Sequence, residues 1–260
     1  MPNESENTRP TISNIRKMLS QAEKGGVQNT IQNCVTVLQN DPILADSIRL
    51  NLLSERIDIV KPMGWQRSGP TLTDTDMMYI LRRMEKYGLY SEKRVSAAIR
   101  IVANENHYHP IRDYLNELKW DGTARISRAL HRFLGAAEDE LTTEALKIFL
   151  LGAIKRVFHP GCKFEMMLCL VGGQGAGKSS FFRLLAIKDE WFSDDLRRLD
   201  DDNVFRKLQG HWIMEMSEMI ATANAKSIEE IKSFLSKQKE TYKIPYETHP
   251  ADRPRQCVFG

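Results

Sequence analysis

This sequence has no long apolar run, no strong excess of one charge and no closely spaced cysteines. No apolar stretch reaches the roughly 18 residues that a membrane-spanning helix needs, and the polar start MPNESENTRP does not resemble a signal peptide. The formal net charge of +3 over 260 residues is too small to indicate a general nucleic-acid binder, and the charges are too mixed to indicate a membrane surface. Any basic contact surface must therefore be local.

The cysteines and histidines do not form a recognisable metal or redox motif. The four cysteines are Cys34, Cys162, Cys169 and Cys257. They are far apart and have no C-x-x-C spacing, which predicts a reduced, cytoplasmic protein. Cys169 lies in a predicted strand, where a small buried thiol is expected. His107 and His109 have no third histidine or cysteine near them, so we interpret this pair as loop or helix-start structure and predict no metal there.

The most informative segment is residues 164–186, FEMMLCLVGGQGAGKSSFFRLLA. An apolar run at residues 166–171, predicted to be a strand, leads into a glycine-rich loop and then into a predicted helix. The loop fits the pattern G-x-x-x-x-G-K-[ST], and a strand before it with a helix after it is the context that indicates a P-loop. The alternative is a glycine-rich turn between strand and helix that binds nothing.

Each residue type in this loop suits a bound phosphate. Glycines let successive backbone N–H groups turn toward one anion, and the following helix adds its free N–H groups and the positive end of its dipole. Lys178 is expected along the β- and γ-phosphates, and the Ser179 hydroxyl on Mg²⁺. The predicted nucleotide-binding residues are Gly172, Gly173, Gln174, Gly175, Ala176, Gly177, Lys178, Ser179 and Ser180. The expected ligands are therefore ATP and Mg²⁺.

Hydrolysis also needs carboxylates near the metal and the attacking water. After a glycine turn, the short apolar run of residues 212–214 predicts a buried parallel strand that ends at Glu215, with Glu218 three residues later. Ligands of open α/β sheets lie at the carboxyl ends of the strands, where Glu215 is expected. We assign Glu215 to the Mg²⁺ and the water, and Glu218 to orienting that water, although these roles can be shared or exchanged. Alternatively, both glutamates only complement a helix dipole.

Periodicity and turn residues divide the chain into three predicted parts. Residues 1–27 are expected to be a disordered or weakly helical lead-in. Residues 28–122 form a mostly helical accessory domain, with β-like runs at residues 48–53 and 56–60. Residues 123–260 form the core that carries the P-loop, preceded by its own helical layer and incomplete at the C-terminus.

A local basic segment follows the acidic residues. It contains the candidate nucleic-acid contacts Lys232, Lys237, Lys239, Lys243 and Tyr246. Lysines can follow the phosphates of a single strand while an aromatic ring stacks on a base. However, residues 226–255 contain seven Lys or Arg against five Asp or Glu, so the excess of positive charge is small. A solvated hairpin or a subunit contact is the alternative.

Together these motifs resemble the virulence-associated E family, proteins encoded by phages and genomic islands. The resemblance is carried by residues 107–110, 113–115, 120–122, 160–163, the P-loop, 210–212, Glu215, Glu218, Lys232, Phe234, Ser236, Tyr242, 245–246 and 254–257. It extends over most of the chain from about residue 30.

The resemblance implies an α/β P-loop NTPase fold, AAA+-like with a core of the superfamily 3 helicase type, after a mostly α-helical accessory domain. It implies an ATP hydrolase that requires Mg²⁺ and acts as a helicase-like motor on single-stranded or forked DNA during replication of a phage or mobile genetic island. A homo-oligomeric ring in the full-length protein and a primase partner are further implications, with no membrane involved.

The family pattern continues past position 260 with a polar sensor residue, so we expect weak or no ATP turnover from residues 1–260. Candidates for the arginine that acts on a neighbouring subunit are Arg156, Arg183, Arg253 and Arg255. Two rival functions remain. A small-molecule kinase needs an Arg-rich lid and an acceptor pocket, neither of which we find in the sequence. A non-enzymatic, nucleotide-gated regulator that uses the P-loop for assembly predicts a change of oligomer size without turnover.

Overall fold

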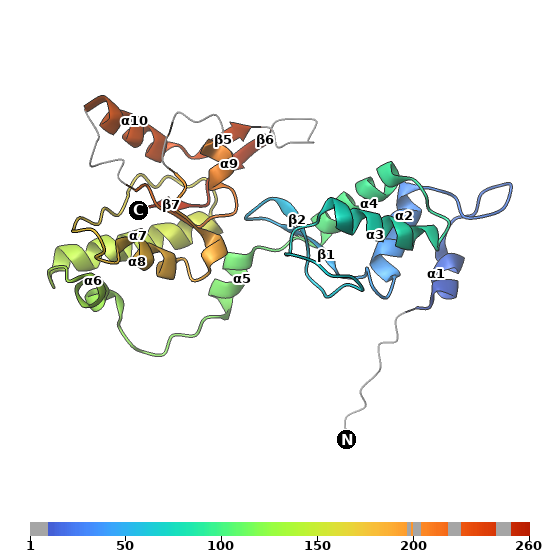
Figure 1. Cartoon of the computed structure of the whole chain (residues 1–260), viewed down its shortest axis with the longest axis horizontal. Coiled ribbons are helices and arrows are strands. Elements are labelled where there is room, and N and C mark those ends of the chain that lie inside the picture. Colours follow the sequence, from blue (N-terminus) through green and yellow to red (C-terminus); the bar gives the residue numbers. More distant parts are fainter. Residues whose placement is uncertain (1–9, 197–198, 200–203, 218–224, 243–250) are drawn as a thin grey trace, which may run out of the picture. The chain divides into compact units, whose positions relative to one another are not determined.

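The computed structural model describes residues 10–196, 199, 204–217, 225–242 and 251–260, and Figure 1 shows the chain. The chain forms two compact units, one ending at Pro110 and the other running from Ile111 to Gly260. We expected the boundary between residues 122 and 123. The earlier boundary has a tertiary cause, because the helix that begins at Pro110 packs on residues that come much later in the second unit. There Arg112 donates to the Val157 carbonyl (2.7 Å), and the Tyr114 ring meets Trp191 edge-on.

The first unit combines helices with one short hairpin. Its elements are α1 (Ile12–Met18), α2 (Ile31–Asn40), β1 (Ile48–Asn51), β2 (Arg56–Ile59), α3 (Asp74–Glu85) and α4 (Glu92–Glu105). The antiparallel pair β1–β2 confirms the two predicted β-like runs. Threonine side chains accept the first backbone N–H groups of α1, α2 and α3, and at α3 Thr73 and Asp76 form a reciprocal capping box.

Residues 12–27, which we predicted to be part of a lead-in, belong to the first unit. Ile15 of α1 and the following Leu19 are buried in the same apolar cluster as Leu38 of α2 and Ile99 of α4. A backbone bridge between Gln21 and Val27 closes the turn after α1. The reason is apolar burial, because α1 is too short to be stable without tertiary contacts.

One buried carboxylate joins three parts of the first unit. Asp41, at the end of α2, is fully buried and accepts hydrogen bonds from Arg83 Nε (2.8 Å), Tyr87 Oη (2.6 Å) and the backbone of Ile43 (2.9 Å). Burial raises the pKa of Asp41, but the bonds from Arg83, Tyr87 and Ile43 outweigh it, so the pKa is lowered overall. The charged carboxylate is therefore part of the folded structure.

We predict that Asp41→Asn lowers the free energy of unfolding of the first unit by about 3 kcal/mol at pH 7, because it leaves Arg83 without its anion. The native pKa lies below the unfolded value of about 3.9, so this stabilisation is present above about pH 4 and disappears as the pH falls further. Hydrogen exchange of α2 peptides in urea measures the difference. Asp46→Asn, at an exposed ion pair with Lys61, is the matched control. Equal stability of the Asp41 variant and the parent at pH 7 would contradict this account.

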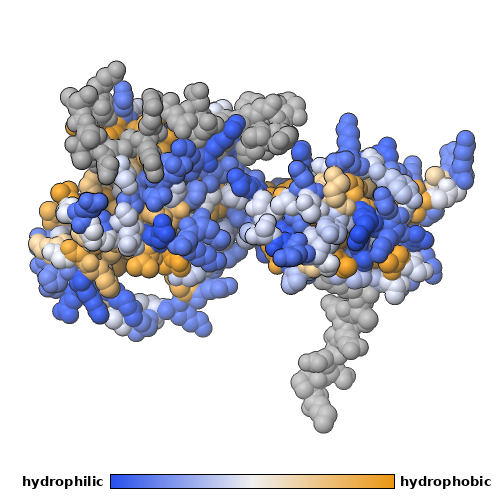
Figure 2. Space-filling model, in the orientation of Figure 1, coloured by the Kyte–Doolittle hydropathy of each residue, from blue (hydrophilic) through white to orange (hydrophobic). Residues whose placement is uncertain are grey.

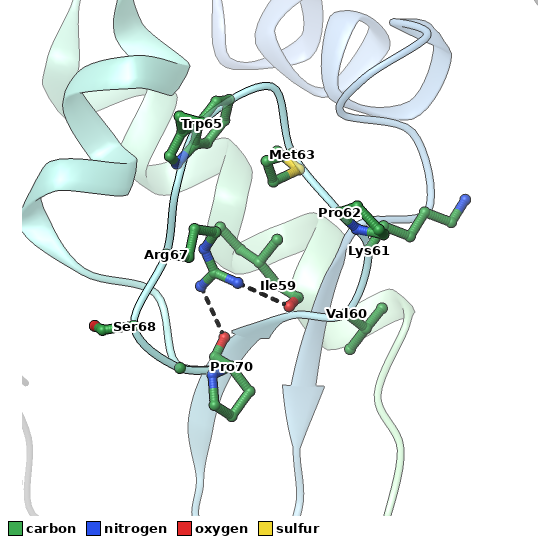
Figure 3. Close-up of a pocket in the computed structure, with 10 residues that line it drawn as sticks. Ile59, Val60, Lys61, Pro62, Met63, Trp65, Arg67, Ser68 and Pro70 are labelled. Atoms are coloured by element: carbon green, nitrogen blue, oxygen red, sulfur yellow. Dashed lines mark hydrogen bonds between the residues drawn. The ribbon is translucent and has the colours of Figure 1, made fainter.

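A shallow pocket of about 500 Å³ lies inside the loop between β2 and α3. Figure 3 shows that Arg67 reaches across the loop and donates to the carbonyls of Ile59 (3.1 Å) and Pro70 (3.0 Å). Arg67 also pairs with Asp76 at 2.8 Å, and Trp65 Nε1 donates to the same carboxylate. The polar groups of this loop therefore hold its own shape.

The second unit carries helices on a small parallel sheet and a separate hairpin. Its elements are α5 (Pro110–Glu117), α6 (Ile126–Leu134), α7 (Glu140–Phe158), α8 (Lys178–Leu185), η1 (Asp189–Trp191), β3 (Phe192–Ser193), α9 (Val204–Leu208), β4 (Ile213–Met214), α10 (Ala225–Ser236), β5 (Lys239–Tyr242), β6 (Ala251–Pro254) and β7 (Val258–Phe259). Helix α7 is apolar on more than its buried side. Its Leu151 is exposed, as is Phe133 of α6, and Figure 2 shows apolar surface around these helices.

The sheet is parallel, and its strand order differs from the order in the sequence. The order is β3–β4–β7, so the strand that ends at Glu215 lies between two strands that are distant in sequence. On the far side of β7, Met167 forms a parallel bridge to Phe259. The segment leading to the glycine loop and the acidic strand β4 are therefore separated by β7, and their carboxyl ends point to the same edge.

The predicted strand at residues 166–171 is wrong in extent. Leu168 N donates to Phe259 O (3.3 Å), and Met167 forms the single bridge of this segment to the sheet among the described residues. Val171 is consequently 98% exposed, and Cys169, which we expected to be buried, is exposed as well.

Two buried arginines hold the sheet to its surroundings. Arg156 of α7 is fully buried and donates to the carbonyls of Cys257 and Phe164, both at 2.7 Å. Arg255 is 3% exposed, forms two hydrogen bonds to Glu240 Oε1 and stacks on Phe234. Both guanidinium groups therefore have structural partners inside their own unit.

Candidate nucleotide site

The glycine loop is an open turn before α8. Gly175 and Gly177 have φ angles of +79° and +80°, the left-handed region that favours glycine. A Cβ added at Gly172, Gly173 or Gly175 would meet nothing within 4 Å, so free space lies beside the loop. Gly177 is the N-cap of α8, and Phe181 N donates to its carbonyl (2.8 Å). The first N–H groups of α8 therefore follow directly from the loop.

The inner face of α8 is anchored by aromatic rings. Phe181 and Phe182 are buried, and Phe182 meets Phe149 of α7 edge-on with ring centroids 5.8 Å apart. A Cβ at Gly260 would lie 2.3 Å from the Phe182 ring, so only glycine fits there without a shift. This close contact fixes α8 against the carboxyl end of β7.

Lys178 covers its own loop. Its Nζ donates to the carbonyls of Gly172 (2.9 Å) and Gly173 (2.7 Å). The ammonium group is thus held over the loop by two neutral acceptors. An anion bound there can replace those acceptors with stronger, charge-assisted hydrogen bonds.

Ser179 and Glu215, which lie 36 residues apart in the sequence, meet across the sheet edge. The Ser179 hydroxyl donates to Glu215 Oε1 at 2.6 Å. Glu215 follows β4 directly, and its backbone N–H donates to Ser193 O (2.7 Å), which continues the pairing with β3. The structure therefore brings together the two residues that the sequence assigned to Mg²⁺.

One oxygen of Glu215 is left unused. The residue is 8% exposed, and its Oε2 is buried without a hydrogen-bond partner in the described part of the chain. A buried carboxylate oxygen without a partner is costly, so such an atom indicates a ligand. Mg²⁺ prefers oxygen ligands, and Ser179 Oγ and Glu215 Oε2 are oxygen atoms that can coordinate it. The residues present therefore fit a divalent cation.

Sequence reasoning missed two residues near this edge. Ser217 donates to Glu215 Oε1 at 2.9 Å. Asp194 directly follows β3, just as Glu215 directly follows β4. Its carboxylate lies 3.9 Å from the guanidinium group of Arg183, which is one helical turn after Ser179 on α8. Residues 191–202 are rich in Asp and Arg, a composition typical of a solvated connection. The buried pair Trp191 and Phe192 inside this charged stretch was the available signal for a strand.

The candidate nucleic-acid contacts have acidic neighbours. Lys232 pairs with Glu229 at 2.8 Å, Lys239 pairs with Asp252, and Lys237 Nζ lies 4.0 Å from Glu240. Lys243 and Tyr246 lie outside the described residues, as does Glu218. Contact of this hairpin with DNA stays a prediction.

The arginine candidates for action on a neighbouring subunit can now be separated. Arg156 and Arg255 are buried with partners in their own unit, which excludes them from reaching another subunit in this conformation. Arg183 is half exposed, so it remains available. Among the described residues no cluster of three or more His, Cys, Asp or Glu could hold a metal ion. His107 Nδ1 donates a hydrogen bond to the Asn104 carbonyl (2.9 Å).

Comparison with known proteins identifies the family. Residues 115–260 match the model of the virulence-associated protein E-like domain, and the chain belongs to that family. It is thereby associated with phages and mobile genetic elements, and the resemblance in the sequence is confirmed over residues 115–260. The match covers nearly all of the second unit and leaves the first unit outside. No match to a curated protein was found. Within the described ranges, no helix is both long and apolar enough to cross a membrane.

Proposed function

We propose that the second unit is an α/β P-loop NTPase core of the superfamily 3 helicase type, which binds ATP with Mg²⁺ and hydrolyses it. The single observation that carries this proposal is the 2.6 Å hydrogen bond from Ser179 to Glu215, whose Oε2 has no partner among the described residues. A glycine-rich turn that binds nothing does not need a carboxylate from another strand at its serine. The parallel order β3–β4–β7, with the glycine loop beyond β7, also supports this proposal.

Each residue has a definite task in this function. Lys178 exchanges the carbonyls of Gly172 and Gly173 for phosphate oxygens, and the loop N–H groups with the start of α8 bind the remaining phosphate charge. Ser179 donates a hydrogen bond to Glu215, so the lone pairs of its hydroxyl oxygen remain available to the cation. When bound, Mg²⁺ supplies positive charge to the β- and γ-phosphates.

Hydrolysis forms a bond between a water oxygen and the γ-phosphorus and breaks the bond from that phosphorus to the bridging oxygen, which gives ADP and inorganic phosphate. Glu215 acts on the cation and on that water, and Glu218, which lies outside the described residues, orients the water. Placement matters, because a misplacement by about 1 Å can cost on the order of 10²-fold in rate. We propose further that single-stranded or forked DNA stimulates this turnover, with other copies of the chain and a primase as partners.

Isothermal titration with a slowly hydrolysed ATP analogue tests the nucleotide site in this chain. We expect binding that is tighter with Mg²⁺ than with EDTA, and at most weak phosphate release from ATP by residues 1–260. A nucleotide-dependent change of oligomer size without any turnover would favour the nucleotide-gated regulator instead. Absence of binding in both conditions would contradict the proposal.

A further inference from the structure

Two serine hydroxyls hold the same oxygen of Glu215. Ser179 Oγ lies 2.6 Å from Oε1, and Ser217 Oγ lies 2.9 Å from it. A carboxylate oxygen has two lone pairs, so Oε1 is saturated by these two donors, whereas Oε2 has no partner among the described residues. The two serines therefore determine which carboxylate oxygen accepts hydrogen bonds and which one is available to a ligand.

This arrangement fixes a torsion that is otherwise loose. Rotation of a glutamate carboxylate about its last bond is broad and roughly two-fold. Two donors on Oε1 select one orientation, and this keeps Oε2 in one place. An unpartnered oxygen that is held in one place is the kind of group a divalent cation can bind without first ordering it.

The two serines belong to different structural elements. Ser179 is on α8 and moves with the phosphate loop. Ser217 comes from the same chain segment as Glu215, and the residue between them, Met216, is buried and donates its N–H to Gly260 O (2.8 Å). The backbone leading to Ser217 is thus tied to the end of β7, and its hold on Glu215 is independent of the loop.

We propose that Ser217 is a positioning residue for the cation site. Its hydroxyl holds Glu215 Oε1 so that Oε2 is presented to Mg²⁺, independently of the conformation of the phosphate loop. This inference rests on the proposed function, because it concerns the same site. Ser217 acts through Glu215 and takes no part in bond making or breaking.

The test is the Mg²⁺ concentration that gives half of the full gain in affinity for the ATP analogue, measured by titration calorimetry. We expect Ser217→Ala to raise that concentration by about tenfold. Loss of a group that hydrogen-bonds a metal ligand typically lowers metal affinity by about 10- to 100-fold, and the expected change is the lower of these values. Affinity in EDTA should not change, and Ser217→Thr should restore the parent value. Ser236→Ala, which removes an exposed hydroxyl bonded to Ser233 O in α10, is the matched control.

The outcomes separate this inference from the proposed function. A Ser217→Ala variant with the parent's Mg²⁺ requirement would overturn the role of Ser217, while the parent's magnesium-dependent binding still supports the site. A loss of affinity in EDTA, or no rescue by threonine, would show a general loosening of the site and would also overturn the inference. If the parent itself shows no magnesium-dependent binding, the proposed function is at fault.

Discussion

Lys178→Ala is expected to weaken binding of the ATP analogue by about 10- to 100-fold. A hydrogen bond to a charged group contributes about 1.5–3 kcal/mol, and each 1.4 kcal/mol is a factor of ten in affinity. Lys178 is bonded only to two loop carbonyls in the described structure, and the loop around it is exposed. Its removal should therefore leave the apolar core and the thermal stability unchanged.

Calorimetric titration of the parent and the variant measures this loss, and circular dichroism checks the fold. Lys147→Ala is the matched control, since Lys147 is an exposed lysine of the same unit that pairs with Glu144 on α7. It should bind the analogue as the parent does. If a folded Lys178→Ala protein keeps the parent's affinity, the glycine loop is not the phosphate site.

Glu215→Gln should have the second large effect, on ATP turnover. The change keeps a side-chain oxygen that can accept from Ser179 and Ser217, but it removes the negative charge next to the cation. Loss of one preorganised electrostatic group in an active site typically lowers the turnover number by about 10²- to 10³-fold. The gain in analogue affinity from Mg²⁺ should shrink as well, while binding in EDTA remains.

Phosphate release under saturating ATP and calorimetry at several Mg²⁺ concentrations measure these two effects. Glu229→Gln is the matched control. It makes the same isosteric change in a glutamate that forms an exposed ion pair with Lys232, and it should behave like the parent. Unchanged turnover and an unchanged Mg²⁺ requirement in Glu215→Gln would assign the carboxylate to sheet structure only, and the metal site would have to lie elsewhere.

Local signals in the sequence were sufficient where the physical cause is local. Thr73 and Asp76 mark the start of α3 in the sequence itself, because a capping box involves four consecutive residues. The G-x-x-x-x-G-K-[ST] pattern predicted the loop before α8, and Gly175 and Gly177 adopt there the φ angles that other residues rarely adopt. The short apolar run before Glu215 predicted β4, because a buried strand needs consecutive apolar side chains, which is again a local feature.

Errors arose where pairing or packing with distant residues decides the outcome. The apolar run at residues 166–171 predicted a strand, but a strand exists only as far as a neighbour pairs with it, and that neighbour is β7. Phe192 lies in a charged segment, and it forms a strand because Phe192 and Ser193 pair with Ile213 and Met214 of β4. The unit boundary moved because α5 packs on residues that come much later in the sequence.

The sequence by itself determined which chemical groups are available: a glycine loop with Lys178 and Ser179, and a strand that ends at Glu215. These follow from residue type and short spacing. Only the tertiary structure decided that Ser179 and Ser217 share one carboxylate oxygen and that the other oxygen has no partner in the described part of the chain. It also decided that Arg156 and Arg255 are buried. The physical reason is that a carboxylate's partners and a guanidinium's burial depend on the order of parallel strands, which joins segments that are far apart in the chain.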